Sequence, residues 1–399
     1  MAVFGMVSAV AGFVKVRYLI DKAIIDNMAF RMHYRITSAI LFLCCILVTA
    51  NNLIGDPISC INDGVPPHVL NTYCWITYTF TLPNSQAHLE GMSHPGLGNG
   101  HNEEKRIHAY YQWVPFMLFF QGILFYIPHW IWKNWEEGKV RMISDGIRGT
   151  AASIADDRGN RQNRLVQYLL DTLHMHNTYS FGYFFAEVLN FVNVVGNIFF
   201  LDKFLNGAFL KYGTDVVKFS NMNQDQRTDP MIQVFPRMTK CTFHKYGASG
   251  TIQTHDALCV LALNILNEKI FIFLWFWFII LSVVSGLALV YSAAVILLPS
   301  TRETILKRRF RFGTPNGVEA LVRKTQVGDF LLLHLLGQNM SLRVFGEVLD
   351  ELARRLHMES NPPSAPSTLE MAPIYPDIDK FSKESETFPT LKGKKGALD

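Results

Sequence analysis

The sequence has little charge and none of the common enzyme motifs. Only 18% of its 399 residues are charged, whereas 49% are hydrophobic and 13% aromatic, a balance typical of a multi-span membrane protein rather than a soluble domain. A glycine-rich phosphate loop, a nucleophile elbow and a His-Glu-X-X-His metal box are all missing. The net charge of +4 is too small to indicate a nucleic-acid partner. These absences favour a protein that is not an enzyme, with no cofactor, no metal site and no bound nucleic acid.

Long apolar stretches are what the sequence does contain, and they predict an all-α membrane protein with four transmembrane helices. The predicted spans are residues 28–51, 111–132, 179–201 and 270–298. In the second span, tryptophans are expected to mark both headgroup belts, with Trp130, Trp132 and Trp135 at one end. Pro115 lacks a backbone N–H, so we expect it to bend this span and to leave the carbonyl of Tyr111 for another partner.

The distribution of basic residues predicts how the spans are oriented. The N-terminal segment carries several Lys and Arg residues close to the first span, whereas the first loop carries only Lys105 and Arg106, so the N-terminus and, after four spans, the C-terminus are expected in the cytoplasm. The segments between and beyond the spans are an N-terminal helix at 1–27, a first extracellular loop at 52–110, a cytoplasmic helical loop at 133–178, a second extracellular loop at 202–269, a cytoplasmic helical region at 299–360 and a tail at 361–399. The tail is rich in Pro, Ser and Lys and is expected to be disordered.

Four of the six cysteines fall in the two predicted extracellular loops. Cys60 and Cys74 lie in the first loop, and Cys241 and Cys259 lie in the second. Because the outside of the cell is oxidising, we expect disulfides, and four cysteines allow three connectivities between which the sequence does not choose. Neither pair has the short spacing of zinc ligands. The other two cysteines lie in the first span, where we expect them to pack as small hydrophobic side chains.

The extracellular loops also lack acceptor sites for N-linked glycans. The only Asn-X-Ser/Thr site in the chain, at Asn339, falls on the predicted cytoplasmic side. Bulky glycans on the loops would obstruct contact between two cells, so their absence favours a protein that docks. Within the first loop, residues 83–108 are rich in Gly, Asn and His and are expected to be flexible. Its histidines are expected in solvent; they are His88, His94, His101 and His108.

The third predicted span carries a stripe of polar residues at helical spacings of three, three and four. The stripe consists of Glu187, Asn190, Asn193 and Asn197. A polar stripe within a membrane faces protein or water, so it serves either hydrogen bonds between helices or a pore. A second stripe, of valines from Val3 to Val14, is too short to span and predicts a helix lying on the membrane surface.

One heptapeptide at the start of the second span carries a specific resemblance. The sequence Tyr110-Tyr111-Gln112-Trp113-Val114-Pro115-Phe116 resembles the signature of the innexin family of invertebrate gap-junction proteins. The run Phe273-Leu274-Trp275-Phe276-Trp277-Phe278 in the fourth span and the segment Gly328-Asp329-Phe330-Leu331-Leu332 are also innexin-like. With the order of spans and loop cysteines, the resemblance covers roughly residues 1–340 and is closest to arthropod members.

The resemblance implies a structural subunit of a gap-junction channel at the plasma membrane, surrounded by lipid. Such subunits assemble with themselves and with other innexins into hemichannels, octameric in the family, which dock with a hemichannel of the adjacent cell and pass ions and small molecules. It also implies the disulfides Cys60–Cys259 and Cys74–Cys241. In place of a surface helix, it implies a pore funnel lined by Met1, Ala2, Val3, Phe4 and Met6.

Three other interpretations remain open. They are a large-pore channel that does not dock, a four-span adhesion or scaffold protein without a pore, and a transporter or receptor with a ligand site at the polar stripe. Adhesion proteins of the claudin type lack a second cysteine pair in their second loop, and a transporter more often shows internal repeats, of which we find none. Dye transfer between paired cells would separate these interpretations.

Overall fold

Within its described residues, the chain is helical apart from one small sheet. The computed structural model describes residues 23–82, 96–97, 104–144, 147, 155–220, 229–309 and 315–360. The expected pore funnel at Met1–Met6, the histidines His88, His94 and His101 and the tail from residue 361 lie outside this part. The chain divides into two compact units, Met1–Arg354 and Arg355–Asp399. Of the second unit, the described part is the end of helix α15.

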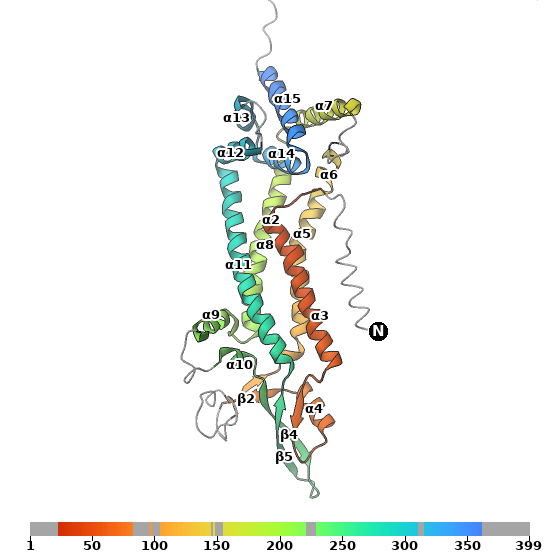
Figure 1. The fold of residues 1–399 in the computed structure, drawn as a ribbon, viewed down its shortest axis with the longest axis vertical. Helices are drawn as coiled ribbons and strands as arrows, with labels where there is room; N and C mark the ends of the chain where they lie inside the picture. Colours follow the sequence, from red (N-terminus) through yellow and green to blue (C-terminus); the bar gives the residue numbers. More distant parts are fainter. Residues whose placement is uncertain are drawn as a thin grey trace, which may run out of the picture. The chain divides into compact units, whose positions relative to one another are not determined.

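Four helices in the described part are long and apolar enough to cross a membrane. The first, Met28–Ile54, consists of α2 (Met28–Arg31), the π-helical segment η1 (Met32–Thr37) and α3 (Ser38–Ile54), and the others are α5 (Val114–Glu136), α8 (Asn177–Phe204) and α11 (Leu263–Leu297). They pack in a ring, α3 on α5, α5 on α8, α8 on α11 and α11 on α3 (Figure 1). This confirms the predicted helical membrane protein with four spans.

Apolar side chains from every span fill the centre of this bundle. Leu41, Leu118, Val194, Leu274 and Phe278 are fully buried. Only between 33% and 50% of the most apolar window of each span is buried inside the chain. The rest of the apolar surface is available for lipid or for another subunit.

Pro115 does not bend the second span, so that prediction is wrong. Helix α5 begins at Val114, which puts Pro115 in the first helical turn. The N–H groups of a first turn have no partner within the helix, and proline is therefore well tolerated there. The proline in the interior of α5 is Pro128, which the prediction overlooked. It lacks the N–H that would bond to the carbonyl of Leu124.

The fourth span begins seven residues before the predicted one, at Leu263 rather than at residue 270. Its first turns carry Asn264 and Glu268, which are fully buried. Asn264 Nδ2 donates to the carbonyl of Pro236 at 2.7 Å, and Glu268 pairs with Arg237 at 2.9 Å. This part of α11 packs against the segment that connects α8 to α11. Its polar side chains find partners there, as buried polar groups require.

A five-stranded antiparallel sheet joins two segments of the chain. We call the segment between the first and second spans the first connection and the segment between the third and fourth spans the second connection. The strands are β1 (Ser59–Ile61), β2 (Thr79–Thr81), β3 (Arg106–His108), β4 (Met238–Tyr246) and β5 (Ile252–Val260), in the order β1-β5-β4-β2-β3. Strands β4 and β5 form a long hairpin in which Met238 lies opposite Val260 and Tyr246 opposite Ile252. The sequence analysis did not predict this sheet: β1, β2 and β3 have only three residues each and show no alternating pattern, and the nine-residue strands β4 and β5 were overlooked.

Shorter helices lie at the two ends of the spans. On the side of the sheet they are α4 (Pro67–Ile76), the 3-10 turn η3 (Tyr110–Gln112), α9 (Phe209–Ser220) and α10 (Pro230–Val234). On the other side they are α6 (Lys139–Ser144), α7 (Ala155–Asp171), α12 (Pro299–Arg309), α13 (Pro315–Lys324), α14 (Val327–Asn339) and α15 (Leu342–Ser360). The sheet therefore sits where α3 and α8 end and where α5 and α11 begin.

His108 is not in solvent, contrary to the prediction. It lies in β3, is 2% exposed, and its Nε2 forms a 2.8 Å hydrogen bond with Thr81 Oγ1 on the neighbouring strand β2. Burial, together with the charge of Arg106, lowers the pKa of His108 to about 3. The ring is therefore neutral near pH 7 and acts as part of the sheet.

Helix α14 docks on the corner between α7 and α8 through its first turn. The Asp329 carboxylate accepts hydrogen bonds from His176 Nδ1 at 3.0 Å and from the backbone N–H groups of His174 and Gln326 at 3.1 Å. Burial raises the pKa of Asp329, but these hydrogen bonds outweigh burial and hold the pKa below its ordinary value. The stabilisation that Asp329 contributes is therefore complete above the pKa that its carboxyl group has in the unfolded chain. It is lost as the pH falls through the lower pKa of the folded protein.

Gly328 allows this close contact, since a Cβ there would lie 2.3 Å from the backbone carbonyl of His176. We expect Gly328→Ala to destabilise the purified full-length protein by about 1–3 kcal/mol, because backbone cannot move aside as a flexible side chain can. The measurement is a melting curve in detergent.

The control for this prediction is Gly159→Ala in α7, where a Cβ meets nothing within 4 Å. This change should be neutral or stabilise by about 0.5–1 kcal/mol, since alanine favours a helix more than glycine does. Equal melting temperatures for the two variants would contradict the close packing at Gly328.

Candidate functional site

Two disulfides join the connections that form the sheet. Cys60 in β1 bonds to Cys259 directly opposite in β5, and Cys74 in α4 bonds to Cys241 in β4. The bonds link residues separated by 199 and 167 positions in the sequence. This is the pairing that the family resemblance implies, whereas the cysteine spacing alone left three possibilities.

The four cysteines form a closed apolar cluster rather than a metal site. Each is at most 4% exposed, and Ile58, Leu70, Tyr111 and Leu261 pack around them. The sulfurs of Cys60, Cys74 and Cys259 lie within 4.8 Å of one another. Each belongs to a disulfide, however, and offers no thiolate, which is the form of cysteine that binds a metal.

The signature heptapeptide fastens this cluster to the second span. Tyr111 is 1% exposed, its ring centroid lies 4.7 Å from that of Trp75, and its hydroxyl donates to the carbonyl of Cys74 at 3.2 Å. Gln112 Nε2 donates to the carbonyl of Trp75. Two side chains of the signature thus hold the helix that carries Cys74.

The neighbouring tyrosine of the signature faces the second connection. The hydroxyl of Tyr110 donates to the carbonyl of Val234 at 3.2 Å, and its ring meets Phe235 edge to face with centroids 5.6 Å apart. Phe235 is fully buried in the core of the bundle. The heptapeptide therefore links both connections to the second span. These contacts use its aromatic rings and its polar side chains, which explains why it contains both.

The hairpin β4–β5 ends in exposed apolar side chains. Tyr246 is 74% exposed and Ile252, its cross-strand partner, is 65% exposed. The turn between them contains Gly250 with φ of 76°. Ile61 in the edge strand β1 is 66% exposed. The hairpin tip thus presents two large apolar side chains to solvent, whereas Ile61 lies on another strand, opposite Leu258.

Glu187 of the polar stripe bonds to two other spans. Its Oε1 accepts from Asn27 Nδ2 at 2.6 Å, and its Oε2 accepts from Ser292 Oγ of α11. Asn27 also caps the first span, because its Oδ1 accepts from the N–H of Phe30 at 2.7 Å. Within one chain, this geometry favours the interpretation that Glu187 forms hydrogen bonds between helices.

The other members of the stripe behave differently. Asn197 Nδ2 donates to the carbonyl of Asn193 at 2.8 Å and to its Oδ1 at 3.0 Å, so these two bond along their own helix. Asn193 is half-buried, whereas Asn190 is 3% exposed. Neither amide atom of Asn190 has a hydrogen-bond partner. The stripe is thus not a single functional unit.

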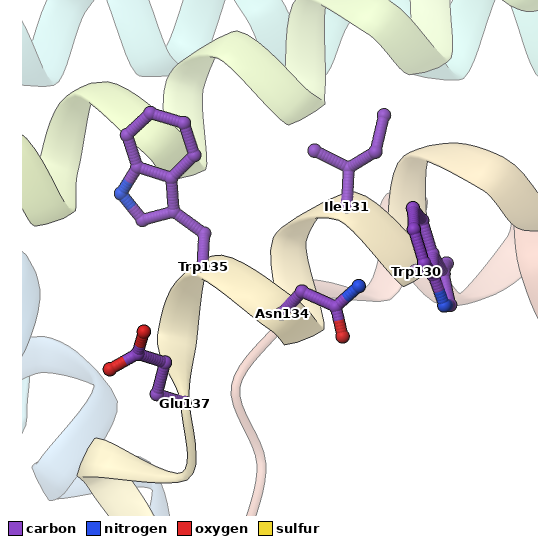
Figure 2. Close-up of a pocket in the computed structure, with 5 residues that line it drawn as sticks. All are labelled: Trp130, Ile131, Asn134, Trp135 and Glu137. Carbon is purple, nitrogen blue, oxygen red and sulfur yellow. The ribbon is translucent and has the colours of Figure 1, made fainter.

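The end of the second span carries an open pocket of about 450 Å³. Figure 2 shows Trp130, Ile131, Asn134, Trp135 and Glu137 around it. Trp130 and Trp135 are 55% and 40% exposed, as expected of a headgroup belt. Trp132 is fully buried and donates from Nε1 to the carbonyl of Ile25 at 3.0 Å, so its predicted place in the belt is wrong.

A polar cluster at the start of the first span was not predicted. Asp26 is 3% exposed and pairs with Arg31 at 3.1 Å and with His129 of α5 at 3.5 Å. The ring of His129 stacks on that of Tyr34 with centroids 3.6 Å apart. Only the position of Asp26 just before an apolar stretch could have indicated the cluster, because its partners come from a distant helix.

Comparison with known proteins agrees with this architecture. A family model for innexins matches residues 26–356. Innexin inx3 of Drosophila melanogaster is 62% identical over 396 residues, which cover 97% of this chain and 100% of that protein. Innexin inx2 and innexin shaking-B of the same fly are 48% and 42% identical, over 87% and 83% of this chain and 95% and 90% of their own length. The chain belongs to the innexin family.

Proposed function

We propose that this protein is a subunit of a hemichannel that docks, through its disulfide-braced sheet, with a hemichannel of an adjacent cell. Innexins form gap-junction channels and are not enzymes. The observation that supports docking is the sheet itself, in which two disulfides fix both connections at one end of the spans. Such a surface has a fixed shape before it meets an identical opposing surface, which favours binding because little conformational freedom is lost on docking.

The orientation that fits this function follows from the basic residues. The first connection carries only Lys105 and Arg106, whereas the segments before the first span and after the second and fourth spans are rich in Lys and Arg. The second connection also carries lysines, but long loops count little in this rule, so the side of the sheet faces outward and both termini lie in the cytoplasm. The apolar surface left on the four spans suits lipid and neighbouring subunits. The subunit assembles with itself and with other innexins, as an octamer if it follows its family. Ions and small molecules then diffuse through a pore whose width and charge set selectivity.

The apolar tip of the hairpin is the part of the sheet that we assign to the docking contact. Tyr246→Glu should abolish current between paired cells, because two hemichannels would then face each other with desolvated negative charges. Current through undocked hemichannels in single cells should persist, since Tyr246 is exposed and supports no core.

The matched control is Met142→Glu in α6, because Met142 is also 74% exposed but lies at the opposite end of the spans. It should leave both currents unchanged. Normal paired-cell current in the Tyr246 variant, at equal surface level, would favour a channel that does not dock through this tip.

Both disulfides are expected to be necessary for coupling. Replacement of any of Cys60, Cys74, Cys241 or Cys259 with Ser should abolish dye transfer between cells, since loss of a native disulfide typically costs about 2–5 kcal/mol and frees one connection from the other. Cys44→Ala is the control, because Cys44 is a free cysteine within the first span. It should transfer dye with at most a small loss of stability. Dye transfer in all four Ser variants would refute the role of the sheet.

The N-terminal segment tests whether the pore is built as the family resemblance implies. A cysteine at Val3 or Phe4 should react with a small thiol reagent in open hemichannels and reduce their conductance. The reagent should have no effect on the wild type, in which Cys44 is buried and Cys45 half-buried within the first span. If neither engineered cysteine reacts, the segment lies on the membrane as a surface helix instead.

A further inference from the structure

Three spans line a small, partly open polar cavity near the start of the first span. Its volume is about 10 Å³, and its lining comes from the first, third and fourth spans. The lining residues are Ala29, Phe30, His33, Glu187, Asn190, Ser285 and Ala288. A cavity of this size holds about one water molecule and has no room for a second.

The hydrogen bonds around the cavity leave one acceptor of His33 without a partner. Ser285 Oγ donates to the carbonyl of Leu281 at 2.7 Å, so at 2.6 Å it accepts from His33 Nε2–H. In a neutral ring the proton on Nε2 makes Nδ1 an acceptor. His33 is 1% exposed, and its Nδ1 has no hydrogen-bond partner.

Asn190 brings the complementary groups to the same cavity. It is 3% exposed, and neither its Nδ2 donor nor its Oδ1 acceptor has a partner. Buried polar atoms are rarely left unsatisfied, because each has lost its hydrogen bonds to bulk water. The carboxylate of Glu187 accepts from Asn27 and Ser292, and Asn190 forms no hydrogen bond with it.

We propose that this cavity is a binding site for one water molecule, which accepts from Asn190 Nδ2 and donates to His33 Nδ1. Water fits better than a cation, since a cation cannot accept the N–H of Asn190. The bound water connects Asn190 of α8 to His33 of the first span, and His33 in turn bonds to Ser285 of α11. The three spans thus share one hydrogen-bond network. The hydrogen bond between Asn27 and Glu187 lies beside this network, where the chain enters the first span.

Small side chains and an irregular turn create the space. Ala29 and Ala288 line the cavity where larger residues would fill it. His33 belongs to the π-helical segment η1, in which Thr37 Oγ1 donates to the carbonyl of Met32 five residues earlier at 2.9 Å. A π-helical turn inside a longer helix is often found at functional sites.

The direct experiment is a cryo-electron microscopy structure of the full-length protein in lipid nanodiscs at a resolution that shows ordered water. The proposal requires a density peak within hydrogen-bonding distance of both Asn190 Nδ2 and His33 Nδ1. X-ray hydroxyl-radical labelling of the same sample should oxidise Phe30, because this side chain lines the cavity and is only 1% exposed. An empty cavity, or a peak bonded to oxygen atoms alone at the short distances of a cation, would overturn the proposal.

A second experiment uses a variant that fills the cavity. Filling a dry apolar cavity stabilises a protein, but filling this one displaces the water and leaves His33 and Asn190 without partners. Ala288→Val should therefore lower the melting temperature and abolish labelling of Phe30. Ala293→Val, at an exposed position of the same helix, is the control for the helix propensity of valine and should retain both. A melting temperature of Ala288→Val equal to or above that of the control would refute the water site.

Discussion

The two disulfides are the constraint on which the arrangement of this subunit depends. They join residues far apart in sequence, Cys60 with Cys259 and Cys74 with Cys241. Each connects the segment between the first two spans to the segment between the last two. They attach the three-residue strand β1 to β5 and the short helix α4 to β4, and strands as short as β1 are not stable alone. With them, the ends of all four spans are tied to one sheet, and the signature tyrosines Tyr110 and Tyr111 pack against it.

The spans obey a second constraint, which is that polar groups in a membrane need partners. Glu187 meets it with Asn27 and Ser292, and so connects the start of the first span to α8 and α11. His33 and Ser285 form another link between the first and fourth spans. These bonds lie at the end of the bundle opposite to the disulfides. The bundle is thus fixed covalently at one end and by hydrogen bonds at the other, where rearrangement breaks no covalent bond.

The sequence predicted those features that depend on a continuous stretch of residues. Four apolar stretches were sufficient for the four spans, and the heptapeptide around Trp113 was sufficient for the family. Pro115 was misjudged because proline is tolerated in the first turn of a helix and disruptive in its interior, and the sequence did not indicate that the helix starts at Val114. The pairing of β1, β2 and β3, the burial of His108 and the partners of Glu187 were not predictable, since each depends on residues from distant segments. The hairpin β4–β5 is local in the sequence and was overlooked.

In the proposed junction, the apolar tip of the β4–β5 hairpin meets the same surface of a subunit in the neighbouring cell. Site-directed cross-linking examines this contact directly, with a cysteine at Tyr246 and two cell populations that carry different epitope tags. We expect a cross-linked dimer that contains both tags and forms only when the two populations touch. Cross-links between subunits of one cell alone, or none between cells that are electrically coupled, would contradict it.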